Sequence, residues 1–313
     1  MSNFVVRRLL SVIPVALIVL VTVFLLLHVG PGDPAALIAG ENATPAQIEE
    51  IRQRLFLDRP LIEQLFLYLS QVARLDFGES VYSGFPVLTL IMQRVEPTTM
   101  LAMSTLTLSV LIAVPSGVWA AWRAGSAVDT ALIIASVLGF SVPVFIVGYL
   151  LVDIFALRAG WFPVQGYKPL SSGLWNSLRS LMLPSISLSL LFSALVARIT
   201  RATMIEVLSE DYIRTARAKG AKNGRVLIVH ALKNIGVPVV TVVGTSFAAL
   251  LGGVVITESV FNIPGMGRLT VDAIQTRDYP VVQGVLIVFS FALISVNLLV
   301  DLSYALFDPR VRQ

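Results

Sequence analysis

The sequence predicts an all-α membrane protein with six transmembrane helices and both termini in the cytoplasm. Hydrophobic residues make up 56% of the 313-residue chain, charged residues 13%, and the mean hydropathy is +0.83. A soluble domain is far less apolar than this. Six uncharged or nearly uncharged stretches approach or exceed the ~20 residues that a helix needs to cross the hydrocarbon core. Lys and Arg are also distributed unevenly between the segments that join these stretches.

The predicted spans follow one another along the chain with short or medium connections. They cover residues 9–29, 98–122, 130–157, 181–197, 237–256 and 280–307. Within them, Asp153 and Asp301 are the charged residues. The first run is long for a secretory signal and leads into the rigid turn 30–34, so we expect a retained helix. The chain has no cysteine and two histidines, which makes disulfides and His or Cys metal sites poor expectations.

The distribution of basic residues predicts the orientation. With the amino terminus inside, thirteen Lys and Arg residues lie on the cytoplasmic side and ten on the other side. Five of those ten belong to the long segment 30–97, where charge determines orientation only weakly. Both termini are therefore expected in the cytoplasm.

The segment 30–97 is the one sizeable region between spans that we expect outside the membrane. Its nine acidic and five basic residues give it a net charge of −4. Residues 44–47 form a capping-box pattern with proline at the first helical position, followed by Ile48, Ile51 and Leu55 at helical spacing. A break at 58–60 precedes a second helical pattern. We therefore divide the chain into 1–29, an external helical segment 30–97, and a five-helix core 98–313.

The cytoplasmic loop 198–236 is unusually basic and has a helical pattern of its own. It holds eight Lys and Arg residues against three acids. A narrow stripe of small or apolar residues lies opposite a charged face, and the glycines Gly220 and Gly224 suit a turn. The stripe consists of Ile205, Ser209, Tyr212, Ala216 and Gly220. By pattern alone such a loop sets topology or contacts lipid headgroups; the alternative is a docking face for a protein.

Long segments of the chain resemble one known family. The segments are FVVRRLLSVIPV at the amino end, HVGPGDP, LDRPLIEQ, LDFGES, DYIRTARAKG, GGVVITESVFNIPGMGRL, RDYPVVQG and DPRVR. They are similar to the inner-membrane permeases of binding-protein-dependent ABC importers, in the dipeptide, oligopeptide and nickel branch. The resemblance covers essentially the whole chain. It implies a type I ABC importer permease fold and a multi-pass location in the bacterial inner (plasma) membrane.

The resemblance also assigns roles to residues. It places coupling to the ATPase on the loop, with Gly220 matching the glycine of the family motif. The coupling residues that it implies are Tyr212, Arg214, Thr215, Ala216, Arg217, Ala218, Lys219, Gly220, Ala221 and Lys222. Arg214 and Thr215 depart from the glutamate and alanine of the wider family, in the manner of the peptide branch. Asn262 in the external turn and Asn297 and Asp301 in the last span are candidates for the pathway or an external gate, with structural packing as the alternative.

The implied partners are a second homologous permease, two cytoplasmic ATPase subunits, an external substrate-binding protein and membrane lipid, without nucleic acid. This chain itself is expected to be no enzyme and to hold no cofactor, with ATP and Mg in the ATPase subunits. None of its four lysines follows a glycine, as a phosphate-binding P-loop requires. Short peptides are the expected substrate, and nickel or glutathione-like ligands are the alternatives.

Two other classes of membrane protein are compatible with the composition. Residues 30–33 match the Gly-x-Gly-Asp of intramembrane aspartyl proteases, but the flanking prolines place Asp33 in a turn and no Tyr-Asp partner motif exists. A secondary transporter usually has broken helices in two related halves, and we find no such repeat. The stripe Gly244, Ala248 and Gly252 predicts close helix packing, within this chain or against the second permease.

Overall fold

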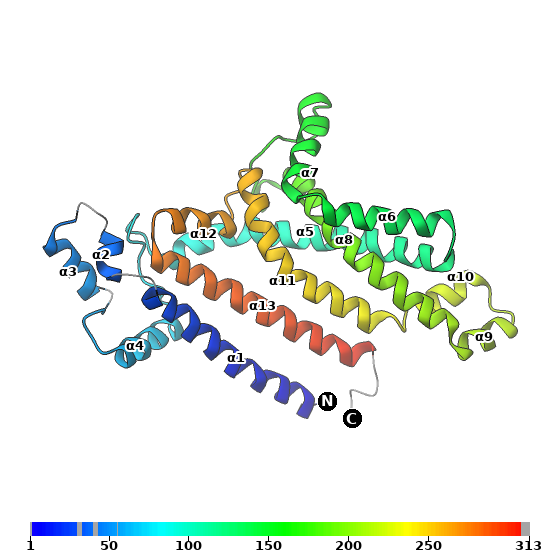
Figure 1. The fold of residues 1–313 in the computed structure, drawn as a ribbon, viewed down its shortest axis with the longest axis horizontal. Coiled ribbons are helices and arrows are strands. Elements are labelled where there is room, and N and C mark those ends of the chain that lie inside the picture. The colour runs from blue at the N-terminus through cyan, green and yellow to red at the C-terminus, as the bar shows by residue number, and fades with distance from the viewer. Residues whose placement is uncertain (1, 30–32, 40–42, 55, 308–313) are drawn as a thin grey trace.

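The computed structural model describes the whole chain except residues 1, 30–32, 40–42, 55 and 308–313. The described part is a bundle of long helices with a small helical cap at one end (Figure 1). Five helices are long and apolar enough to cross a membrane, and a bent pair of helices brings the number to six if it counts as one span. The predicted all-helical membrane fold is confirmed.

The first helix and the cap follow the sequence pattern closely. α1 (Ser2–Val29) is followed by α2 (Pro34–Ala39), α3 (Pro45–Arg54) and α4 (Leu61–Ala73). The capping box is present: the Thr44 N–H donates to Gln47 Oε1 at 2.8 Å, and the Gln47 N–H donates to Thr44 Oγ1 at 3.4 Å. Leu55, expected on the apolar face of α3, lies outside the described residues.

α5 (Val87–Trp122) and α8 (Leu174–Ser209) form the centre of the bundle. Each has 36 residues, well beyond the ~20 that hydrocarbon requires. Both extend past the spans expected from hydropathy, because their ends carry polar residues that a hydropathy pattern leaves out. The two helices approach closely, since a Cβ on Gly117 would lie 2.7 Å from the Ala197 carbonyl oxygen.

The third span differs from the single helix predicted over 130–157. α6 (Ala127–Ser141) and α7 (Val144–Leu151), which continues as a π-helical turn to Arg158, meet at an angle of 100°. Pro143 has no N–H to donate and disfavours helical backbone at Val142, which is extended with φ −90° and ψ 120°. The predicted third span is therefore a bent pair of helices, which completes the six predicted spans when it counts as one, and α7 projects from the bundle (Figure 1).

In the carboxyl-terminal half, the chain crosses the bundle twice more, as α11 and α13. α9 (Asp211–Ala218), α10 (Asn223–Arg225) and a π-helical turn (Val226–Ala231) precede α11 (Gly236–Val260). α12 (Met266–Gln275) and α13 (Tyr279–Phe307) complete the chain. The start of α1, the end of α13 and α9 lie toward one end of the bundle, and the cap lies at the other (Figure 1). This arrangement agrees with both termini on the side of the basic loop.

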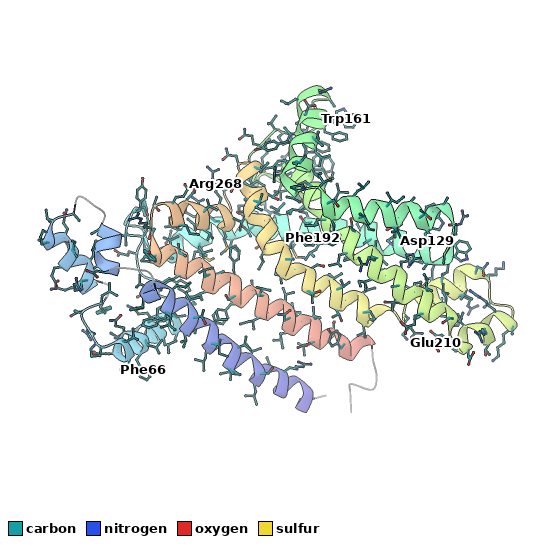
Figure 2. All side chains as sticks on the ribbon, viewed as in Figure 1. Phe66, Asp129, Trp161, Phe192, Glu210 and Arg268 are labelled. Atoms are coloured by element: carbon teal, nitrogen blue, oxygen red, sulfur yellow. The ribbon has the colours of Figure 1, made fainter. Side chains whose placement is uncertain are left out.

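The main core lies where α5, α8 and α11 meet, around Phe192 (Figure 2). Leu101, Leu188 and Leu250 are completely buried there. Serine side chains of α8 share this interior by bonding to their own helix, as Ser187 Oγ does to the Pro184 carbonyl at 2.7 Å. Their small size allows helices to pack closely inside a membrane. α8 therefore runs through this core as a long connection between the two ends of the bundle.

Candidate functional site

The basic loop forms a short helix, α9, which is fixed to the end of the bundle by one buried side chain. α8 ends at Ser209, and Glu210 is extended with ψ 147°, so the chain turns sharply before α9 begins. Ile213 is fully buried. It packs in an apolar cluster at the ends of α5, α8 and the loop, with Ala121, Met204, Val226, Leu227, Ala231 and Ile235. Ile213 thereby joins α9 to the ends of α5 and α8.

The predicted stripe along one continuous helix is wrong in this region. The break at Glu210 places Ile205 and Ser209 on α8 and Tyr212 and Ala216 on α9. Tyr212 is 42% exposed, and the buried position is Ile213. Glu210 itself lies at the junction in Figure 2. The apolar spacing in the sequence continues past Glu210, because periodicity depends on spacing along the chain. The break between the two helices depends on the backbone angles of Glu210 alone.

One hydrogen bond joins α9 to another segment, and further contacts lie within the helix. Asn234 Nδ2 donates to the Tyr212 hydroxyl at 2.6 Å, which joins the start of α9 to the segment that leads into α11. Arg214 pairs with Asp211 at 3.1 Å along the helix, between two exposed side chains. Thr215 Oγ1 donates to the Asp211 carbonyl at 3.0 Å. Tyr212 therefore serves as an attachment point of α9 as well as part of its surface.

Gly220 ends α9 with a left-handed residue. Its φ is +84°, and its N–H donates to the Arg217 carbonyl at 2.9 Å. The Ala221 N–H donates to the Ala216 carbonyl at 3.1 Å. These two bonds and the positive φ form a Schellman motif, which closes a helix end with glycine at this position. The glycine is needed for the backbone angle, since an added Cβ would meet nothing within 4 Å.

The rest of the predicted coupling segment presents charge to the surroundings. Ala216 and Ala221 are partly buried, while the other members are exposed. The exposed members are Tyr212, Arg214, Thr215, Arg217, Ala218, Lys219, Gly220 and Lys222. Four of them are cationic, and only Arg214 has an ion pair among the described residues. The segment is thus a mainly basic protrusion with an apolar root.

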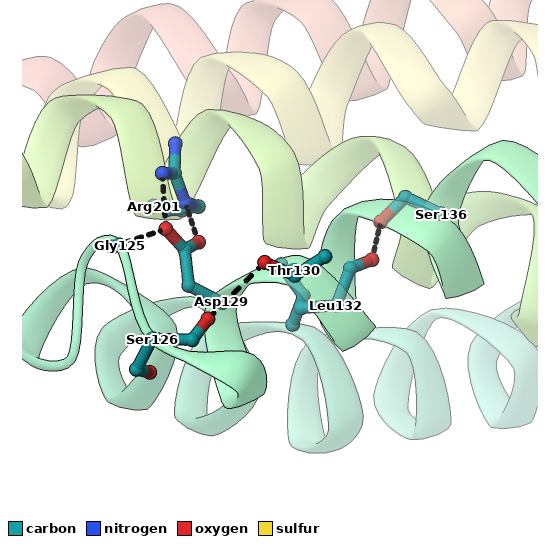
Figure 3. A network of polar contacts seen from close by, with 7 residues as sticks. All are labelled: Gly125, Ser126, Asp129, Thr130, Leu132, Ser136 and Arg201. Atoms are coloured by element: carbon teal, nitrogen blue, oxygen red, sulfur yellow. Dashed lines mark hydrogen bonds and ion pairs between the residues drawn. The ribbon is translucent and has the colours of Figure 1, made fainter.

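A buried ion pair between α6 and α8 was not predicted from the sequence. Arg201 of α8 donates from Nη2 to Asp129 Oδ2 at 2.7 Å and from Nε to Oδ1, and the Gly125 N–H donates to Oδ2 at 2.9 Å (Figure 3). The side chain of Asp129 is 5% exposed. Arg201 was counted among the basic residues of the loop, and Asp129 lies just before the predicted span. An acid in the first turn of a helix was the available signal.

The three pathway candidates do not come together. Asn262 lies in the turn between α11 and α12, at a left-handed φ of 52°, and accepts a hydrogen bond from Arg268. Asp301 forms an ion pair with Arg8 at 3.0 Å, which joins α13 to α1 near the end of the bundle that carries α9. Asn297 is exposed one turn before Asp301. Asn262 is thus at the opposite end of the protein from the other two.

The turn after α11 is organised by Glu258, whose role the sequence did not indicate. Glu258 is fully buried. Its Oε1 accepts a hydrogen bond from Thr98 Oγ1 at 2.5 Å, and its Oε2 accepts the Arg268 N–H at 3.0 Å. The Met266 N–H in turn donates to Thr98 Oγ1 at 2.8 Å. We call Glu258, Thr98 and the 265–268 turn the external clasp. It fixes the start of α12 to α5.

The stripe of small residues in α11 packs partly within this chain. A Cβ on Gly244 would overlap the Val300 side chain of α13, so the two helices touch there. Ala248 is exposed, and a Cβ on Gly252 would meet nothing within 4 Å. Among the described residues, no group of three or more His, Cys, Asp or Glu is placed to hold a metal ion.

Comparisons with known proteins give a consistent result. Residues 113–313 match the family model described as the binding-protein-dependent transport system inner membrane component, and residues 1–113 match the model described as the N-terminal part of a binding-protein-dependent transport system membrane component. The probable peptide ABC transporter permease protein y4tP of Sinorhizobium fredii is 52% identical over 312 residues, covering 100% of both chains. The glutathione transport system permease protein GsiC of Escherichia coli is 43% identical, covering 100% of this chain and 99% of that protein.

A solved structure supports the fold. A chain of the MetNI methionine ABC transporter in an inward-facing conformation superposes with a TM-score of 0.57 and 16% identity. The match covers 70% of this chain and 96% of that chain. At this identity the likeness concerns the arrangement of the helices.

Proposed function

This chain belongs to the family of binding-protein-dependent transport system inner membrane components, and from that premise we propose that it forms the import pathway for short peptides with a second, related permease. As a member of that family it is a permease of an ABC importer in the inner membrane and is not itself an ATPase. We further propose that two ATPase subunits bind on the side of α9 and an external binding protein delivers the substrate at the cap side.

The observation that carries the proposal is the construction of α9. A basic helix with a capped end and a buried apolar root is suited to sit in a pocket of another protein. The cationic residues Arg217, Lys219 and Lys222 would meet acidic or polar groups of the ATPase subunit, and Ile213 would pass its displacement into the bundle. A loop that served only to set topology would need neither the Schellman ending nor the cluster around Ile213.

The contacts of α8 also provide a path by which a movement of α9 would reach the rest of the bundle. α8 starts at Leu174 near the external loop and reaches α9 after 36 residues, which at ~1.5 Å per residue is roughly 50 Å. The close contact at Gly117 joins it to α5, and the Asp129–Arg201 pair joins it to α6. Tilting α9 would thus move three helices as one body. Because the clasp joins α5 to α12, this motion would also reach the external side.

Glutathione is the second candidate substrate. The relatives include glutathione permeases that are 43% identical over the full chain. Glutathione is itself a short peptide with one unusual linkage, so the two proposals share most of the chemistry that a pathway must accept.

The test is uptake by the complete complex in proteoliposomes, with the binding protein outside and ATP inside. We expect uptake of a labelled dipeptide that requires ATP, and no ATP hydrolysis by this chain alone. Labelled glutathione is offered in a second assay: uptake of the dipeptide but not of glutathione would favour the first candidate, and the reverse would favour the second. Uptake without ATP, or uptake of neither compound, would contradict the proposed function.

A further inference from the structure

A cavity of about 320 Å³ lies between α5 and α8 in the outer half of the bundle. Its apolar walls include three methionines and a tryptophan, namely Met100, Met103, Met182 and Trp175. The hydroxyls of Ser104 and Ser185 also line it and bond to each other at 2.6 Å. Methionine side chains are flexible and polarizable, so a pocket built from them adapts to apolar groups of different shape.

The face of α5 that lines this cavity combines methionines with polar residues. Glu96, Met100, Met103 and Thr107 follow each other at i, i+4, i+7 and i+11, which places them on one face of the helix. Thr99, adjacent to this face, is also exposed. Glu96 lies just outside the predicted span 98–122, whereas Thr99 and Thr107 lie within it, where polar residues generally face protein or water. This part of α5 therefore faces an aqueous space or a protein partner.

The inner half of the same helix gives the contrast. Its exposed residues include Leu111, Ile112 and Trp119, which are suited to lipid. In the outer half the exposed residues are mixed, with Met92 and Met103 beside Gln93, Thr99 and Thr107. We take the outer half as the part that borders the pathway.

Glu96 stands at the outer end of the cavity face and is held in place. Its Oε1 accepts hydrogen bonds from the Tyr167 hydroxyl at 2.6 Å and from the Leu170 N–H at 2.7 Å. Burial and the neighbouring carboxylate raise the pKa of Tyr167 to about 12, so the phenol stays protonated and donates at neutral pH. Within the described part of the chain, no hydrogen bond reaches Oε2.

The spacing between the carboxylate and the cavity fits one amino acid residue. Met100 is one turn from Glu96 and Met103 about two turns, which corresponds to ~6 and ~10 Å along the axis. A group with a cation and a bulky apolar side chain would span this distance. Those are the two recognisable features of the first residue of a peptide whose amino terminus is free.

We propose that Glu96 and the methionine cavity form a site for the amino-terminal residue of a peptide in transit. The ammonium group lies at the Glu96 carboxylate, and the side chain enters the cavity between α5 and α8. This inference rests on the proposed function and adds a preference within it. The permease favours peptides that begin with a large apolar residue, in addition to any selection by the binding protein.

The test compares two dipeptides, Phe-Ala and Ala-Ala, in the reconstituted complex with one binding protein throughout. Met103→Trp fills the cavity from the α5 wall, and Met182→Trp fills it from the α8 wall. Each is expected to lower the ratio of Phe-Ala to Ala-Ala uptake about tenfold, the scale at which burial of a large apolar side chain discriminates. Ile112→Trp is the matched control, since this exposed residue does not line the cavity. It should leave the ratio unchanged.

The charge is tested separately with Glu96→Gln. A glutamine keeps an acceptor for Tyr167 and Leu170 but removes the charge. We expect uptake of both dipeptides to fall about tenfold, as for loss of a charged partner in a binding site. Tyr167→Phe keeps the carboxylate and removes one of the bonds that hold it, and it should have a smaller effect.

The outcomes separate the two proposals. If the unaltered complex imports neither dipeptide, the proposed function fails and this inference fails with it. If it imports both, and Met103→Trp and Met182→Trp leave the uptake ratio at the value of Ile112→Trp, the cavity is not a side-chain site. If Tyr167→Phe reproduces the loss caused by Glu96→Gln, Glu96 acts by holding the loop and not by binding an ammonium group. Membrane abundance and ATP hydrolysis measured in parallel identify variants that fail to assemble.

Discussion

Replacing Gly220 with valine is expected to abolish transport while the protein stays in the membrane at normal abundance. Gly220 has a φ of +84° in the Schellman ending of α9. A β-branched residue is strained there by about 1–3 kcal/mol. The strain is relieved by opening the two bonds to the Arg217 and Ala216 carbonyls, so the surface offered to the ATPase changes. The residue lies outside the spans, which therefore still insert.

Gly224→Val is the matched control for this prediction. Gly224 lies four residues further on, and an added Cβ would also meet nothing within 4 Å, but its φ is not in the left-handed region. Uptake and ATPase activity of the complex are the measurements, with immunoblots of the membrane fraction. Equal loss in both variants, or intact transport in Gly220→Val, would show that the capped end of α9 does not transmit the motion.

The second large effect is expected at the external clasp. In Gly265→Ala, the new Cβ would overlap the buried carboxylate of Glu258. Overpacking of this kind costs about 1–3 kcal/mol, and here it would push the turn away from Thr98 and α5. We expect uptake to fall by at least about tenfold, the equivalent of ~1.4 kcal/mol, while the ATPase subunits stay bound at the other end of the bundle.

A double variant distinguishes the overlap from other causes. In Glu258→Ala the carboxylate is absent, so Gly265→Ala should add little further loss in that background. Glu258→Ala alone also reduces uptake, since the Thr98 hydroxyl and the Arg268 N–H lose their acceptor. Gly252→Ala, in open space on α11, is the control. Additive losses in the double variant would contradict the overlap as the mechanism.

The sequence predicted the class of fold and the start of α3 because both depend on features that are local in the chain. Long apolar runs predict the spans, and the capping box at 44–47 predicts where α3 begins. The motifs quoted above identified the family. Pro143 causes the break between α6 and α7, but its presence in the sequence does not predict a sharp bend. Proline is common in membrane helices that cross the bilayer as one span.

The remaining features depend on contacts between distant residues, which periodicity does not reveal. Asp129 and Arg201 are separated by 72 positions and meet only when α6 packs on α8. Glu258 is quoted within a motif, but its partner Thr98 is 160 positions away. Ile213 is one of several apolar residues in a charged loop, and the turn at Glu210 decides that it is the buried one. The contacts of these residues depend on how the helices pack, so the sequence pattern does not predict them.

The central claim is that α9 is the surface through which this permease meets its ATPase, and photo-cross-linking measures that contact directly. A photo-cross-linking amino acid is placed at Arg217, which is exposed on α9, and at Glu49 on the external cap as the control. The complete complex is irradiated in its membrane. The account predicts an adduct with the ATPase subunit from position 217, with a yield that changes when ATP is added, and none from position 49. A transport-competent complex that gives no such adduct from position 217 would contradict it.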